Sequence, residues 1–170
     1  MSAGAIADMD APPDARRSAA RPAFSALALA LSGRSMQLQN HATGVPDAAP
    51  LRPILTPTHL LLPMDYSAAD AAMSARLHRA AIAHAAAHLR YSPAGQPTGT
   101  LKPMSLALIA ALEDARVEHL LAREFPGTRA WCLPLLAQSL EPHGLSFAAL
   151  ISRMNYALMA QDYRDDNYWV

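Results

Sequence analysis

Two alanine-rich segments, joined by a short stretch of helix-breaking residues, constrain the fold more than any other feature of the sequence. The first segment ends at Tyr91 and the second begins near Pro103. Between them, residues 92–99 contain two prolines and two glycines. Alanine is the best helix former, whereas proline and glycine interrupt helices. We therefore predict two long helices, over residues 68–91 and 103–124, that fold back on each other as an antiparallel hairpin.

The composition agrees with a mainly helical fold. Hydrophobic residues make up 52% of the 170-residue chain, but aromatic residues make up only 6%. A β-sandwich would need more aromatic and β-branched residues, whereas many alanines suit closely packed helices. The length is sufficient for one domain with a hydrophobic core. We expect a flexible N-terminal tail over residues 1–18, followed by a single helical domain over residues 19–170.

The remaining elements are short, and each has a recognisable start or stop signal. Alternating apolar and polar residues predict a strand over 36–39, and the apolar stretch after Pro57 predicts a second strand over 58–62. Together they form a two-stranded ribbon, which must lie against helices. Capping residues and helix breakers delimit the helices. The first helix covers about residues 21–31, with Pro22 in its opening turn and Gly33 after its end, and Ser67 is the N-cap of the helix over residues 68–91. A further helix runs from Thr128 to about residue 140 and is kinked or broken at Pro134. The last helix runs from its cap, Ser146, to about residue 160.

The charge balance and the single cysteine exclude several functional classes. Fourteen basic and fourteen acidic residues give a net charge of zero, which leaves no electrostatic case for binding nucleic acid or an anionic membrane. The apolar run at residues 24–31 is far shorter than the roughly 20 residues that span a bilayer. We interpret it as a helix, with a signal peptide as the less favoured alternative. Cys132 is the only cysteine, so an intrachain disulfide is excluded and a cytoplasmic setting is expected.

The first hairpin helix carries two histidines, His84 and His88, one helical turn apart. Residues four apart lie on the same helix face, so both imidazoles can reach one tetrahedral metal ion, as in the zincin metalloproteases. In zincins a glutamate that acts as general base follows the first histidine, whereas Ala85 follows it here. The pair therefore predicts either a divalent metal such as zinc or a hydrogen-bonded network without metal, and argues against peptide hydrolysis.

The second hairpin helix brings a dense group of charged residues opposite these histidines. Glu113 falls on the same predicted apolar stripe as Ile109, where an unpaired carboxylate is costly, so it is the candidate third metal ligand. Glu118 is about 140° away from Glu113 around an ideal helix, which makes it a less favoured ligand. We assign Asp114 and Arg116 to a structural polar network around the site.

The other candidate residues carry weaker signals. The sequence contains no glycine-rich phosphate loop and no Gly-x-Ser-x-Gly nucleophile motif. Cys132, between Trp131 and Leu133, is interpreted as a buried core thiol. His78 lies off the face of the histidine pair and is expected at the surface. The histidines at positions 59, 119 and 143 are assigned structural or solvated roles.

Several segments, in this order along the chain, resemble the N-terminal part of the NorD/CbbO group of proteins. The segments are ALSGR (30–34), RAAIAHAAAHL (79–89), PTGTLKP (97–103), LEDARVE (112–118), REFPG (123–127) and DYRDDN (162–167). The match covers most of the chain from about residue 25 onward. The His-x3-His spacing followed by Glu-x2-Arg-Val-Glu is also similar to the CobT subunit of cobaltochelatase, a more distant relative.

The resemblance implies an adaptor rather than an enzyme. Proteins of the NorD/CbbO group work with MoxR-type AAA+ ATPases, and NorD is implicated in activating nitric oxide reductase, CbbO in activating Rubisco. Their C-terminal von Willebrand factor A domain is not part of this sequence, so we expect either a fragment or a shortened relative. Two other classes remain open: a degenerate zincin-like metal-binding protein or metalloenzyme, and a plain helical interaction module.

Overall fold

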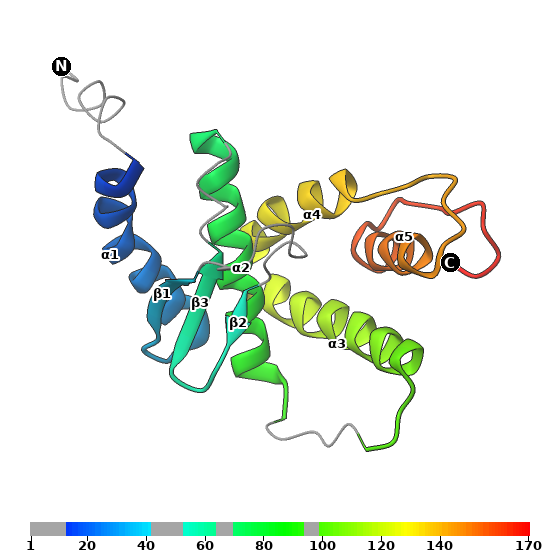
Figure 1. Cartoon of the computed structure of the whole chain (residues 1–170), viewed down its shortest axis with the longest axis horizontal. Helices are drawn as coiled ribbons and strands as arrows, with labels where there is room; N and C mark the ends of the chain where they lie inside the picture. Colours follow the sequence, from blue (N-terminus) through cyan, green and yellow to red (C-terminus); the bar gives the residue numbers. More distant parts are fainter. Residues whose placement is uncertain (1–12, 42–52, 64–69, 94–98) are drawn as a thin grey trace. The chain divides into compact units, whose positions relative to one another are not determined.

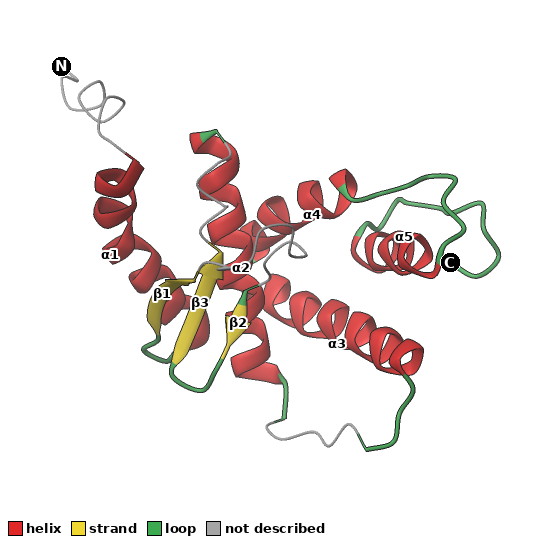
Figure 2. Cartoon of the chain, viewed as in Figure 1, coloured by secondary structure: helices red, strands yellow, loops and turns green. Residues whose placement is uncertain are grey.

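The computed structural model describes residues 13–41, 53–63, 70–93 and 99–170. Within these residues the chain forms five α-helices and three short strands, so the fold is mainly helical with a small sheet, as predicted (Figures 1 and 2). In chain order the elements are α1 (Pro13–Ser32), β1 (Gln37–His41), β2 (Ile54–Leu55), β3 (His59–Pro63), α2 (Ala71–Tyr91), α3 (Pro103–Glu124), the 3₁₀ turn η2 (Pro126–Thr128), α4 (Arg129–Gln138) and α5 (Phe147–Met159).

The chain divides into two compact units, Met1–Ile82 and Ala83–Val170, and helix α2 runs through the division. The first unit holds α1, the sheet and the first half of α2. The second unit holds the rest of α2 together with α3, η2, α4 and α5, including both groups of residues from which a metal site was predicted. The predicted single domain over residues 19–170 covers parts of both units.

Helix α1 begins at Pro13, earlier than predicted. A proline suits the first helical turn, because its nitrogen has no hydrogen that would need a partner there. Pro22, predicted in the opening turn, lies inside the helix. Residues 13–18 of the predicted tail are therefore helical, and residues 1–12 lie outside the described part of the chain. The helix ends at Ser32 and is followed, as predicted, by Gly33, which has a φ of 69° and donates its N–H to the carbonyl of Leu29 at 2.8 Å.

The sheet has three strands, in the order β1-β3-β2, and so exceeds the predicted two-stranded ribbon. The two predicted strands, β1 and β3, pair in parallel with Leu38 opposite Leu60. Strand β2 pairs antiparallel with β3, with Leu55 opposite Leu60, which is fully buried. Strand β2 was not predicted, because Pro53 and Pro57 flank it and a proline cannot donate a hydrogen bond to a neighbouring strand.

The first half of α2 is anchored by a cap and by an aromatic contact. The N–H of Met73 donates to Oδ1 of Asp70 at 2.8 Å, so Asp70 caps the helix. The predicted cap, Ser67, lies outside the described residues. His78 was wrongly predicted at the surface: it is buried, and its ring stacks on Phe24 of α1 with centroids 5.2 Å apart. The helical spacing of α2 gives no information on which residue of another helix contacts His78.

Helix α3 has the predicted bounds, but its buried side coincides with the predicted apolar stripe only at Val117. Its buried residues are Ala111, Ala115, Val117, Leu121 and Ala122. Ile109, on the predicted apolar stripe, is 52% exposed. The prediction followed the large aliphatic side chains, whereas three of the five buried residues are alanines. The elements α5 and η2 contact this helix. The orientation of α3 about its own axis therefore differs from the orientation for which Glu113 was predicted to be the third metal ligand.

The two last helices follow the predicted signals in part. Helix α4 continues through Pro134, and Thr128 gives it no side-chain cap, because its hydroxyl donates to the carbonyl of Phe125 at 2.8 Å. The predicted cap of α5 is present: Oγ of Ser146 accepts from the N–H of Ala149 at 3.1 Å. Of the helices in the described residues, none has the length and apolarity needed to cross a membrane.

Candidate metal centre

The two predicted groups of ionisable residues meet in the second unit, between the C-terminal half of α2 and helix α3. The alanines around the histidines on α2 are buried. The two imidazoles are partly exposed to solvent and contact carboxylates of α3. His84 pairs with Glu118 and His88 with Asp114, whereas Arg90 pairs with Glu124, so the pairs do not follow one order along the two helices. These contacts join the C-terminal half of α2 to α3 within the second unit.

His84 lies between two carboxylates. Its Nδ1 is 2.7 Å from Oε1 of Glu118, and its Nε2 is 3.9 Å from Oδ1 of Asp114. Burial alone would lower the pKa of His84, but the hydrogen bond to Glu118 and the negative charges of Glu118 and Asp114 outweigh it and raise the pKa above 6.5. The side chain of Glu118 is only 16% exposed, whereas that of His84 is 39% exposed, so this hydrogen bond is shielded from water mainly on the side of Glu118.

His88 makes the second contact with the same carboxylate. Its Nε2 is 3.0 Å from Oδ1 of Asp114, and its Nδ1 is 2.8 Å from Oγ of Ser92. The rings of His84 and His88 pack edge to face, with centroids 4.7 Å apart. The sequence analysis did not single out Ser92. Its position four residues after His88, one turn further along the helix axis, is the signal that could have identified it.

One ligand atom from each of His84, His88 and Asp114 lies within 4.8 Å of the others. Zinc bonds to nitrogen and oxygen of about 2.1 Å place tetrahedral ligand atoms roughly 3.4 Å apart, so a small side-chain adjustment brings the three into one coordination sphere. Asp114, which we had assigned to a structural network, thus occupies the place that the sequence analysis gave to Glu113. In both rings Nδ1 contacts another protein group, as is usual for metal-bound histidines.

Glu113 is held by Arg116 instead. Its two carboxylate oxygens accept from Nε and from a terminal nitrogen of Arg116, each at 2.7 Å, and one of them also accepts from Ser92 at 2.6 Å. These hydrogen bonds, first from Arg116 and then from Ser92, lower the pKa of Glu113 to about 2. Arg116 also donates to the carbonyl of Tyr91 at 2.9 Å, so it ties α3 to the last residue of α2.

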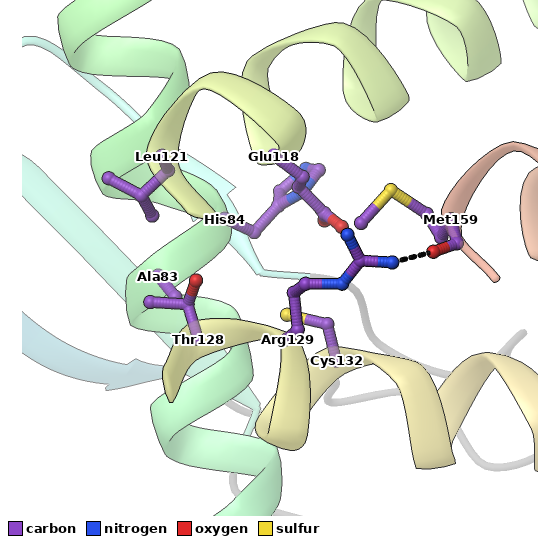
Figure 3. Close-up of a pocket in the computed structure, with 8 residues that line it drawn as sticks. All are labelled: Ala83, His84, Glu118, Leu121, Thr128, Arg129, Cys132 and Met159. Atoms are coloured by element: carbon purple, nitrogen blue, oxygen red, sulfur yellow. Dashed lines mark hydrogen bonds and ion pairs between the residues drawn. The ribbon is translucent and has the colours of Figure 1, made fainter. Parts of the chain in front are cut away.

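A small hollow adjoins the histidine pair on the side of Glu118 (Figure 3). It is lined by Ala83, His84, Glu118, Leu121, Thr128, Arg129, Cys132 and Met159. The guanidinium of Arg129 points into it and donates to the main-chain oxygen of Met159. Burial, with a smaller contribution from the charge of Glu118, raises the pKa of the Cys132 thiol. Cys132 is buried, as predicted, and the raised pKa disfavours its thiolate form.

Comparisons of this chain with protein-family models, with curated proteins and with solved structures gave no match. The resemblance to the NorD/CbbO group therefore stays a prediction. The candidate metal ligands are therefore identified from the interatomic distances and hydrogen-bond partners described above.

Proposed function

We propose that this chain binds a divalent transition metal such as zinc through Nε2 of His84, Nε2 of His88 and the carboxylate of Asp114. One observation carries the proposal: both imidazoles turn Nε2 toward the same oxygen of Asp114, while both Nδ1 atoms contact other side chains. Two imidazoles and one carboxylate are ligands that zinc accepts. A tetrahedral zinc ion would keep a fourth position for water or another ligand.

The surroundings of the site favour an architectural role for the metal over hydrolysis. Ala85 stands where a zincin carries its general base. Glu113 is neutralised by Arg116, and Glu118 contacts His84 through Nδ1, on the side of the ring away from the proposed metal. A metal bound to α2 and α3 would instead clamp the two helices together.

Metal analysis of the full chain, purified without an affinity tag, tests this proposal. We expect one zinc ion per chain, and we expect it to be lost in His84→Ala and His88→Ala. His143→Ala is the matched control, because His143 is exposed and lies outside the site. A wild-type chain that retains no metal after dialysis against zinc, and binds none on titration, would overturn the proposal.

We also propose an adaptor role in the cytoplasm, in which the chain contacts a MoxR-type AAA+ ATPase that acts on a target enzyme such as nitric oxide reductase or Rubisco. Two observations support it. The segments 79–89 and 112–118, which carry the resemblance, contain the residues that meet at the candidate metal centre. Met104, Leu108 and Leu112, spaced four apart on α3, are at least 40% exposed and offer an apolar contact surface.

Isothermal titration of the chain with a purified MoxR-type ATPase tests the adaptor role. We expect saturable binding that Leu108→Glu weakens by at least tenfold, which corresponds to about 1.4 kcal/mol. Leu145→Glu is the control, since Leu145 is also exposed but lies outside α3. The absence of binding by the wild-type chain would leave a plain helical interaction module as the surviving alternative to the adaptor.

A further inference from the structure

We infer that Ser92, held in place by Glu113 and Arg116, is a positioning residue of the metal site. It fixes the imidazole of His88 in the tautomer whose Nε2 lone pair is free for a metal ion. This inference rests on the proposed metal binding and identifies the residues that prepare the site for it. None of the three was expected to serve this purpose from the sequence.

Arg116 holds Glu113 in its ionised form. Arg116 donates a hydrogen bond to each carboxylate oxygen of Glu113, with Nε 2.7 Å from Oε2 and a terminal nitrogen 2.7 Å from Oε1. A carboxylate bound in this bidentate way by a guanidinium is ionised. An ionised carboxylate has no hydrogen to donate, so every hydrogen bond of Glu113 is one that it accepts.

Ser92 makes two side-chain hydrogen bonds, and the charge of Glu113 fixes the direction of both. Its Oγ lies 2.6 Å from Oε1 of Glu113 and 2.8 Å from Nδ1 of His88. A serine hydroxyl has a single hydrogen, and Glu113 can only accept, so this hydrogen points to Glu113. Ser92 must then accept from His88, which places a hydrogen on Nδ1. In the neutral ring, Nε2 consequently carries the lone pair.

The lone pair on Nε2 of His88 faces the carboxylate of Asp114. Nε2 of His88 is 3.0 Å from Oδ1 of Asp114, and both atoms are acceptors in these states. Two acceptors at this distance repel each other unless a proton or a metal ion lies between them. His84 has the same arrangement, since its Nδ1 faces the carboxylate of Glu118 and its Nε2 faces Asp114. A single metal ion would satisfy all three lone pairs together.

The affinity of zinc for Ser92 variants of the full chain tests the inference. We expect Ser92→Ala to weaken zinc binding by about 10- to 100-fold, the usual effect of removing a group that orients a ligand. Ser92→Thr retains the hydroxyl and should restore the affinity. Ser139→Ala is the control, because Ser139 follows the end of α4 and its hydroxyl donates to the main-chain carbonyl of Leu136. Wild-type affinity in Ser92→Ala, or equal loss in Ser92→Ala and Ser92→Thr, would overturn the inference.

Nitrogen-15 NMR of the metal-free chain separates this inference from the proposed function. At an alkaline pH at which the imidazoles are neutral, we expect the ring hydrogen of His88 on Nδ1 in the wild type. In Ser92→Ala we expect it to move to Nε2, where it can donate to Asp114. A wild-type spectrum with the hydrogen on Nε2 would overturn the positioning role whether or not zinc binds. The expected spectrum in a chain that binds no zinc would uphold the positioning role and overturn the metal proposal.

Discussion

Asp114 is the single residue on which the proposed metal site depends most, because its carboxylate faces both imidazoles. Asp114→Asn removes the negative charge and keeps the size of the side chain. Structural zinc sites contribute roughly 10 kcal/mol or more, so losing one of three protein ligands should cost about 3 kcal/mol, or about 100-fold in Kd. Competition with a chromophoric chelator measures this change. Asp162→Asn, at an exposed position, is the control, and equal affinities of Asp114→Asn and wild type would contradict the assignment.

His84 should make the stability of the metal-free chain depend on pH. Although burial lowers its pKa, the hydrogen bond and charge of Glu118 outweigh that effect and raise the pKa above 6.5. A raised pKa in the folded state means that the protonated ring stabilises the fold. This stabilisation is complete below pH 6.5, the ordinary pKa, and is lost as the pH rises through the higher pKa of the folded state.

Urea unfolding in the presence of a chelator, at several pH values across this range, tests the prediction. The free energy of unfolding of the wild type should fall with rising pH relative to that of His84→Gln. His143→Gln should follow the wild type, since His143 is exposed and apart from the site. Parallel curves for wild type and His84→Gln would show that Glu118 does not stabilise the protonated ring.

At the scale of whole elements, the helix bounds were predictable where a local signal marks them. Pro103 opens α3 and Pro126 follows its end, and Ser146 caps α5, so these bounds agree closely with prediction. The start of α1 and strand β2 were missed, because proline was interpreted as a breaker where it begins a helix or flanks an edge strand. A local signal therefore predicts the bounds of an element only where the residue type has a single structural role, and proline has several.

The candidate site was predictable to the level of its helices but not of its third ligand. His84 and His88 share a face because four residues make about one turn, and this holds in any packing. Which carboxylate faces them depends on the rotation of α3, and neighbouring residues on a helix differ by about 100°. Burial of Ala111 and Ala115 sets that rotation and brings Asp114 rather than Glu113 to the imidazoles. The pattern of large aliphatic residues gave no sign of this.

The cap of α5 provides a test at the level of one helix. Ser146→Ala removes the acceptor for the N–H of Ala149 and should lower the free energy of unfolding by about 1 kcal/mol. Ser146→Asp keeps an acceptor and should leave the stability within a few tenths of a kcal/mol of the wild type. Urea denaturation followed by circular dichroism measures both variants. Equal losses in the two would mean that the side-chain oxygen does not cap this helix.

At the scale of the whole chain, the residues after α5 complete the second unit through a buried ion pair. Arg153 of α5 contacts Asp165, and the two side chains are 5% and 1% exposed. Tyr163 and the N–H of Asn167 also donate to Asp165, at 2.5 Å and 2.8 Å. The hydrogen bond from Arg153, with help from Tyr163, lowers the pKa of Asp165 to about 2. The pair is thus ionised and fully hydrogen-bonded, which is the condition under which a buried ion pair is tolerated.

Removing one partner of this pair should therefore destabilise the chain more than removing the pair as a whole. Asp165→Asn leaves the guanidinium of Arg153 buried without a counter-charge, whereas the double change Arg153→Met with Asp165→Leu leaves no buried charge at all. In urea denaturation we expect the midpoint of Asp165→Asn to be the lowest and that of the double variant to lie nearer to the wild type. Arg164→Met, at an exposed neighbouring position, should leave the midpoint unchanged. If Asp165→Asn also kept the wild-type midpoint, the segment that follows α5 would not depend on this ion pair for its position in the second unit.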